Sequence, residues 1–191
     1  MKKLPLFLIG CFILAVGFNF VGCSSTPAPA TPSAPAGLCA NPSSQGFTSI
    51  GTINGPLGAG TMYAQSVTLA SAETATSISI HFNTVATVGQ IRFAIYTDNG
   101  SSNPKNLVVE TNPQNVAPSS WNSASLPNVY LPAGIYYMAL QVTNNTNVDY
   151  NPAGGSLPRV TYAYGVFPDT FPAPPPSPPT SLLSLYLITC P

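Results

Sequence analysis

The chain has 191 residues, of which 45% are hydrophobic, 10% aromatic and only 5% charged. This hydrophobic content is enough to bury a core, so the low charge does not indicate a disordered chain. Five basic residues balance five acidic ones, and without a basic patch to neutralise phosphates the composition argues against nucleic acid as a partner.

The first 22 residues have the layout of an export signal. Two lysines follow the initiating methionine, residues 4–21 are almost wholly apolar, and Gly22 directly precedes Cys23. The segment from Phe20 to Cys23 resembles the lipobox of bacterial lipoproteins. In that family the signal peptide is cut before the cysteine, which carries fatty acids such as palmitate, so the resemblance implies that Cys23 is the lipidated first residue. An uncleaved membrane-spanning helix and an ordinary secretory peptide are the alternatives.

Residues 23–37 are predicted to form a lipid-anchored tether. The stretch consists almost wholly of Pro, Ala, Ser and Thr, a composition that favours extended backbone and would hold a folded domain away from the membrane. Ser24 stands where related lipoproteins carry the Asp that retains them at the inner membrane. The resemblance therefore favours the outer membrane of a bacterial cell envelope, and the membrane, reached through the lipid, is the first predicted partner.

Cysteine usage supports export. Cys11 leaves with the signal peptide and Cys23 is used by the lipid, so Cys39 and Cys190 remain as a pair at opposite ends of the predicted domain. A disulfide between them is the prediction for an oxidising envelope, and it would require the first and last strands to be neighbours. Two free thiols are the alternative.

From residue 38 onward the sequence predicts one all-β domain, 38–191. Ile78, Ile80 and Phe82 alternate with polar residues, which gives that strand one buried and one exposed face. Neutral polar residues would form the surface, either as in exported all-β proteins or as an adaptation to an acidic medium. Short strands of this kind are typical of an antiparallel β-sandwich or jelly roll. The expected strands are 47–53, 62–69, 76–83, 90–97, 106–111, 120–126, 134–143, 159–166 and 181–190.

Residues 91–140 resemble a jelly-roll module of bacterial extracellular proteins. The segment IRFAIYTD at 91–98 matches a strand that ends in the module's IYxD pattern, Trp121 falls in a following strand that carries a tryptophan, and LPAGIYY at 131–137 matches the start of a long strand. Such modules are accessory or surface domains, so the resemblance implies a fold and no fixed activity. The proline-rich segment 167–179 departs from the pattern, and its prolines predict a stiff surface loop.

The inventory of catalytic groups predicts a protein that is not an enzyme. His81 is the only histidine, and nothing in the sequence supplies the carboxylate that a nucleophile triad needs, so it is predicted to be structural or exposed. The five acids fall in predicted turns or strand ends, and no zinc, phosphate-loop or EF-hand motif is present. No cofactor and no metal are predicted. Asp98, in an Asp-Asn-Gly turn, is a weak calcium candidate beside its ordinary role in the turn.

Aromatic side chains are the predicted ligand-binding residues. Tyr162 and Tyr164 share one face of their expected strand, Tyr137 lies in a long strand, and Trp121 lies near a predicted loop. Exposed rings on a sheet face stack on sugar rings, whereas rings that fill the sandwich core bind nothing. The sequence thus predicts four candidates without deciding between these two roles.

The resulting hypothesis is a bacterial envelope lipoprotein whose β-sandwich is non-catalytic and binds a polysaccharide or a surface protein, or has a structural role. A lipid-anchored hydrolase is one alternative, and an acidic neighbour of His81 in the folded protein would favour it. Self-assembly into a surface matrix is another alternative, and an uncovered flat edge strand would favour that one.

Overall fold

The computed structural model describes residues 39, 41–85, 89–175 and 178–191. The predicted signal peptide 1–22, the lipidation site Cys23 and the tether 23–37 lie outside the described residues. Everything that is described belongs to one compact unit, built of strands and turns. The described residues include no helix with the length and apolar character needed to cross a membrane.

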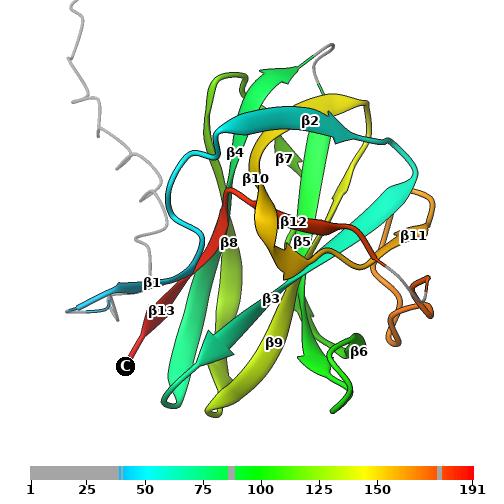
Figure 1. Ribbon diagram of the computed structural model, residues 1–191. Coiled ribbons are helices and arrows are strands. Elements are labelled where there is room, and N and C mark those ends of the chain that lie inside the picture. The colour runs from blue at the N-terminus through cyan, green and yellow to red at the C-terminus, as the bar shows by residue number, and fades with distance from the viewer. Residues whose placement is uncertain (1–38, 40, 86–88, 176–177) are drawn as a thin grey trace, which may run out of the picture. The chain divides into compact units, whose positions relative to one another are not determined.

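The unit is a sandwich of two antiparallel sheets, and the chain passes repeatedly from one sheet to the other (Figure 1). The first sheet has seven strands, and we call it the β4 sheet after its longest strand. Its order is β1-β13-β4-β10-β12, with β2 added on β10 and β8 added on β4. The strands are β1 (Ser43–Gly46), β2 (Ile53–Leu57), β4 (Glu73–Val85), β8 (Ser120–Leu131), β10 (Thr146–Ser156), β12 (Thr180–Leu183) and β13 (Leu185–Cys190).

The second sheet has six strands, and we call it the β9 sheet after its central strand. Its order is β11-β3-β9-β5-β6, with the short β7 added on β5. This arrangement confirms the predicted all-β antiparallel sandwich. The strands are β3 (Thr61–Leu69), β5 (Gln90–Asp98), β6 (Pro104–Glu110), β7 (Gln114–Asn115), β9 (Gly134–Val142) and β11 (Arg159–Thr161).

Some of the predicted strands match the structure closely, and others are wrong or too long. The strongly alternating segments 62–69, 90–97 and 134–143 coincide with β3, β5 and β9 to within one residue. The expected strand 47–53 is wrong, because most of it is an irregular connection between β1 and β2. The expected strand 159–166 ends at Thr161, since the chain there leaves the sheet edge. The long strand β10 was not predicted.

The main core lies between the two sheets and follows the period-two pattern. From β4 it contains Ile78, Ile80 and Phe82, all fully buried, and from β9 it contains Met138 and Leu140. At about 25 cal/mol per Å² of apolar surface removed from water, side chains of this size each stabilise the fold by about 1.5–3 kcal/mol as an upper estimate. The inward residues of β4 thereby determine which of its residues face outward.

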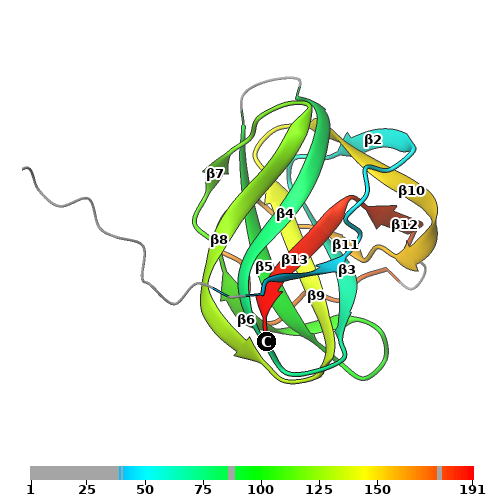
Figure 2. The same cartoon turned by 90° about the vertical axis from the view of Figure 1, so that its left-hand side faces the viewer.

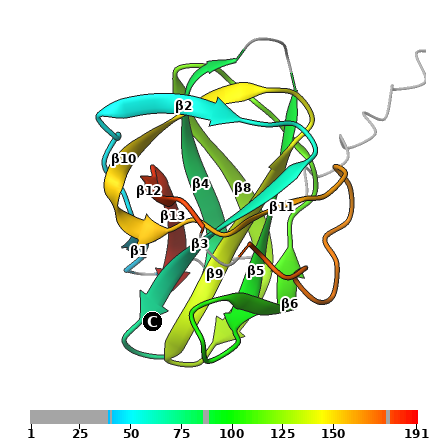
Figure 3. The same ribbon diagram turned by 45° about the vertical axis from the view of Figure 1, so that its right-hand side comes forward.

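A second apolar cluster covers the outer face of the β9 sheet. Phe167 and Phe171 come from the segment that follows β11, and they pack on Tyr96, Met62 and Ala139. The ring of Tyr96 contacts both phenylalanines edge to face, with centroids 6.3 and 5.3 Å away. Figure 3 shows this segment in orange beside β5 and β6. The predicted loop is therefore fastened to the sheet at its start.

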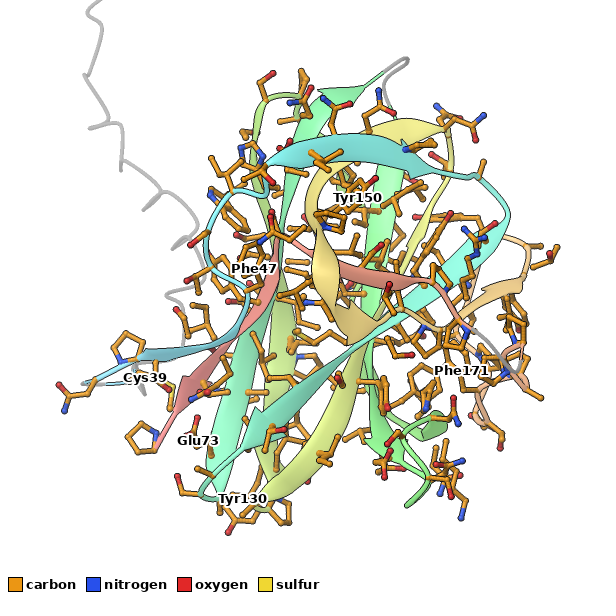
Figure 4. The ribbon with its side chains drawn as sticks, in the orientation of Figure 1. Cys39, Phe47, Glu73, Tyr130, Tyr150 and Phe171 are labelled. Carbon is orange, nitrogen blue, oxygen red and sulfur yellow. A yellow bond between two sulfur atoms is a disulfide. The ribbon has the colours of Figure 1, made fainter. Side chains whose placement is uncertain are left out.

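The predicted Cys39–Cys190 disulfide is present, with the two Cα atoms 5.3 Å apart. It confirms that the first and last strands are neighbours, since β1 pairs antiparallel with β13. Beside it the carboxylate of Glu73 is buried and accepts hydrogen bonds from the hydroxyls of Thr189 and Ser43. Figure 4 shows Cys39 and Glu73 at this end of the sandwich.

Removing the disulfide by the double substitution Cys39→Ser and Cys190→Ser is expected to lower the free energy of unfolding by about 2–5 kcal/mol. The bridge closes a loop of 151 positions and so restricts the unfolded chain. Urea unfolding followed by the fluorescence of Trp121, the single tryptophan, measures the change. Dithiothreitol should destabilise the wild-type protein and leave the double variant unaffected. Equal stability of the two proteins without reductant would contradict the prediction.

Candidate functional site

The outer face of the β4 sheet carries a group of rings that we call the aromatic face: Trp121 from β8, His81 from β4 and Tyr186 from β13. The centroids of Trp121 and Tyr186 are 4.9 Å apart, and those of Trp121 and His81 are 5.3 Å apart, both pairs meeting edge to face. Trp121 and Tyr186 are partly exposed, whereas His81 is 9% exposed. Figure 2 shows β8, β4 and β13 side by side on this face.

The strand register explains how these rings meet. His81 is paired with Trp121 across β4 and β8, and Ser79, two residues earlier on β4, is paired with both Tyr186 and Ser123. Because Ser79 is small, the rings from the two flanking strands can reach each other across β4. The Ser79 and Ser123 hydroxyls are hydrogen-bonded to each other at 2.6 Å. The sheet surface beside the rings is therefore polar, and these two hydroxyl groups have hydrogen-bond partners.

His81 has an acidic partner from a distant part of the chain. Its Nδ1 atom lies 2.5 Å from Oδ2 of Asp149 on β10, and Asn83 donates to the other carboxylate oxygen at 3.2 Å. Asp149 is 4% exposed. The prediction of a structural or exposed histidine is therefore resolved in favour of a buried one, oriented by a carboxylate.

Backbone hydrogen bonds fasten this pair to two further segments. The amide of His81 donates to the carbonyl of Ser184, and the amide of Ser184 donates to the carbonyl of Asp149, both at 2.9 Å. The Ser184 hydroxyl accepts from the amide of Gly51 at 2.8 Å. The backbone of His81 and Asp149 is thus joined to the β12–β13 junction, which bonds to the connection after β1. The carboxylate of Asp149 orients the imidazole.

A histidine oriented by a carboxylate is two thirds of a nucleophile triad, and the third member would be a hydroxyl. The two serines that neighbour His81 in the sheet have other partners: Ser79 bonds to Ser123, and Ser184 accepts from Gly51. Within the described ranges no group of three or more His, Cys, Asp or Glu residues could hold a metal ion. The arrangement is best suited to positioning the rings of the aromatic face.

The structure separates the four predicted ligand-binding aromatics. Trp121 lies on the aromatic face, whereas Tyr137, Tyr162 and Tyr164 lie on the opposite side of the molecule, at the outer face of the β9 sheet. Tyr137 is 2% exposed and belongs to the second apolar cluster, against which Tyr162 packs. Burial, and secondarily the charge of Asp98, raises the pKa of Tyr137 to about 12. Burial likewise raises the pKa of Tyr164. Tyr137 is therefore a packing residue, whereas Tyr162 and Tyr164 are partly exposed and come from the segment after β11.

The weak calcium candidate Asp98 has the hydrogen bonds of a turn residue. Its Oδ2 atom accepts from the amide of Gly100 at 2.6 Å, and the neighbouring Asn99 accepts from the amides of Ser101 and Asn103. Such bonds to the backbone two residues ahead are those of Asx turns. The Asx turn thus accounts for the Oδ2 atom of Asp98, whereas its Oδ1 atom is buried without a hydrogen-bond partner among the described residues.

Sequence reasoning missed two residues of the candidate site, Tyr186 and Asp149, for different reasons. Tyr186 alternates with the buried Leu185 and Leu187, so the period-two pattern could have placed it outward. Asp149 could not have been found in this way, because the strand that carries it was not predicted. Its pairing with His81 joins positions 68 residues apart.

The chain matches no known family model and no curated protein. Among solved structures, one of infectious bursal disease virus, Gx strain, is similar with a TM-score of 0.37 and 12% sequence identity. The match covers 85% of this chain and 45% of the viral chain, so the protein spans less than half the length of that neighbour. A likeness of this strength carries no argument about function.

Replacing Asp149 by Ala is expected to lower the free energy of unfolding by about 2–4 kcal/mol, because it leaves the buried imidazole of His81 and the partly buried amide of Asn83 without their partner. Asp169→Ala removes an exposed carboxylate and is the matched control, with an expected change within about 0.5 kcal/mol. Thermal or urea unfolding measures both. If the two variants are equally stable, the His81–Asp149 pair does not hold the aromatic face.

Proposed function

We propose that this chain is a lipoprotein of the bacterial cell envelope, anchored through Cys23 and carrying a non-catalytic β-sandwich that binds a surface polysaccharide. The signal-like start, the lipobox-like segment and the tether composition support the proposed localisation at the cell envelope. The aromatic face supports the ligand class. It is the single observation on which the binding role rests.

The two outer faces of the sandwich differ in a way that favours the aromatic face as the binding surface. On the β9 sheet, Phe167 and Phe171 cover the outward residues. On the β4 sheet, Trp121 and Tyr186 remain partly exposed, and Figure 2 shows β8, β4 and β13 side by side. Large rings left partly exposed on a charge-poor protein are suited to stack on the apolar faces of sugar rings.

Next to the rings lies a strip of small hydroxyl side chains that suits the same ligand. Ser77 and Ser79 on β4 face Ser125 and Ser123 on β8 in register. Ser123 and Ser125 are exposed. A flat strip of this kind leaves room for an extended chain and offers donors and acceptors to its hydroxyl groups. Neutral polysaccharide is therefore a better match than a charged polymer.

Self-assembly through strand addition at β8, a long edge strand of the β4 sheet, is disfavoured by features of that strand. β8 pairs only with β4 among the described strands, so its other edge is free. Pro127 lies within β8, and the pairing with β4 shifts register between Ala75 and Ser77. Proline and register irregularities are devices by which proteins protect sheet edges from pairing with another chain.

A hydrolytic role is the alternative function, and the His81–Asp149 pair is the observation that favours it. Glycoside or ester cleavage would further need a hydroxyl nucleophile or a second carboxylate beside the imidazole. Ser79 and Ser184 are engaged elsewhere. Binding without cleavage thus accounts for more of the geometry.

Substituting Cys23 by Ser is expected to move the protein from the membrane fraction to the soluble fraction, because the acyl chains that hold it would be absent. Membrane fractionation of the expressing bacterium measures this. The intact mass of the wild-type protein from its native membrane should equal residues 23–191 plus fatty acids. An unacylated mass, or unchanged fractionation of the variant, would contradict the lipoprotein assignment.

Trp121→Ala and Tyr186→Ala are each expected to weaken polysaccharide binding about tenfold, the effect of losing one stacking ring. A glycan array probed with the purified full-length protein selects the ligand, and isothermal titration gives the affinities. Tyr130→Ala is the matched control, because it removes a ring that is 67% exposed. Tyr130 lies on β8, as Trp121 does, but at the other end of that strand. Tyr130→Ala should bind like the wild-type protein.

The outcome separates the two candidate functions. If no glycan binds, or if Trp121→Ala binds as tightly as the wild-type protein, the aromatic face is not the binding surface. New reducing ends in a polysaccharide incubated with the wild-type protein, lost in His81→Gln, would establish the hydrolytic alternative instead.

A further inference from the structure

A pocket of about 200 Å³ opens between the two sheets on the side away from β8, and neither the aromatic face nor the proposed glycan role uses it. The β4 sheet contributes residues of β2, β10 and β12 to it, and the β9 sheet contributes residues of β3 and β11. Leu57, Val148 and Leu183 belong to the buried core and are at most 2% exposed. These apolar side chains line the pocket together with polar groups such as Ser181.

Two tyrosines form the walls of this pocket, and both are fixed in place. The hydroxyl of Tyr63 accepts a hydrogen bond from the amide of Gly58 at 2.9 Å. The ring of Tyr150 lies against β2, so close to Gly55 that a Cβ atom there would stand 2.7 Å from Tyr150 Cε1. Figure 4 shows Tyr150 next to β2. A glycine at position 55 leaves the room that the ring needs beside the strand, so packing holds this wall of the pocket.

Arg159 stands at the rim, and its side chain is exposed. A second hollow of about 210 Å³ lies on its other side and shares Arg159 and Tyr63 with the pocket. Arg92, by contrast, is paired with Glu110 at 3.1 Å. In the described part of the chain the ion pairs are those of His81 and Arg92, so Arg159 has no carboxylate partner.

We propose that this pocket binds a small carboxylate with an apolar body, such as an aromatic or short aliphatic acid. The guanidinium of Arg159 would hold the carboxylate, because its planar donors match the two carboxylate oxygens. The apolar side chains that line the pocket and the two tyrosine rings would hold the body of the ligand. The volume accommodates a single ring and excludes an oligosaccharide, so this site is separate from the aromatic face.

The test uses the full-length protein and 4-fluorobenzoate, followed by fluorine NMR during titration. Saturable binding in the millimolar range is expected, the affinity of a small ligand held by one charged contact and one apolar pocket. Arg159→Gln keeps most of the side chain and removes its charge, and it is expected to weaken binding about tenfold. The neutral analogue 4-fluorobenzyl alcohol should bind the wild-type protein about tenfold more weakly than the acid.

Two control variants make the result specific. Lys105→Gln removes an equal charge from a residue that does not line the pocket. Trp121→Ala removes one ring of the aromatic face. Both variants should bind 4-fluorobenzoate like the wild-type protein. Binding that persists unchanged in Arg159→Gln, equal binding of the alcohol, or no saturable binding would overturn the proposal. None of these results bears on the glycan proposal, which is read from Trp121→Ala on polysaccharide.

Discussion

The alternation of β4 is the constraint on which both the core and the candidate site depend. Burying Ile78, Ile80 and Phe82 between the sheets forces Ser79 and His81 to the outside, because successive side chains of a strand point to opposite faces. A slip of one residue would exchange the two sets, so the apolar core fixes the register and thereby the position of the imidazole. The neighbours β8 and β13 then bring Trp121 and Tyr186 to the same face by pairing alone.

The outer faces of the two sheets differ in whether the chain covers their aromatic side chains. The β9 sheet turns Tyr96 and Tyr137 outward, and the chain itself supplies Phe167 and Phe171 to cover them. The hydroxyl of Tyr96 donates to the carbonyl of Pro168 at 2.8 Å, so the cover is also held by a polar contact. Burial raises the pKa of Tyr96, in keeping with a ring enclosed by the cover. Within the described residues Trp121 stays partly exposed, and the proposed binding role rests on this difference.

The sequence predicted what depends on local alternation and missed what depends on distant pairing. The strands β3, β5 and β9 follow a regular pattern, and the disulfide followed from counting cysteines. β10 was missed because Pro152, Gly154 and Gly155 break its pattern, and the structure shows a register shift there, between Asn151 and Ser156. That strand pairs with β2, β4 and β12, so its existence depends on three partners that no local window contains. Asp149 and Tyr150 were lost from the prediction together with it.

β10 also connects the two sites physically. Asp149 turns to the outer face and holds His81, whereas its neighbours Val148 and Tyr150 turn inward, Val148 into the core and Tyr150 to the wall of the pocket beside Arg159. The backbone pairing of so irregular a strand specifies its register only weakly. The short, directional hydrogen bond between Asp149 and His81 adds a contact that fits one register. The pair that orients the aromatic face thus also sets the position of Tyr150. Few charges are present in this protein, and two of its carboxylates are buried. Asp149 holds this irregular strand through His81, whereas Glu73 bonds to Ser43 of β1 and Thr189 of β13.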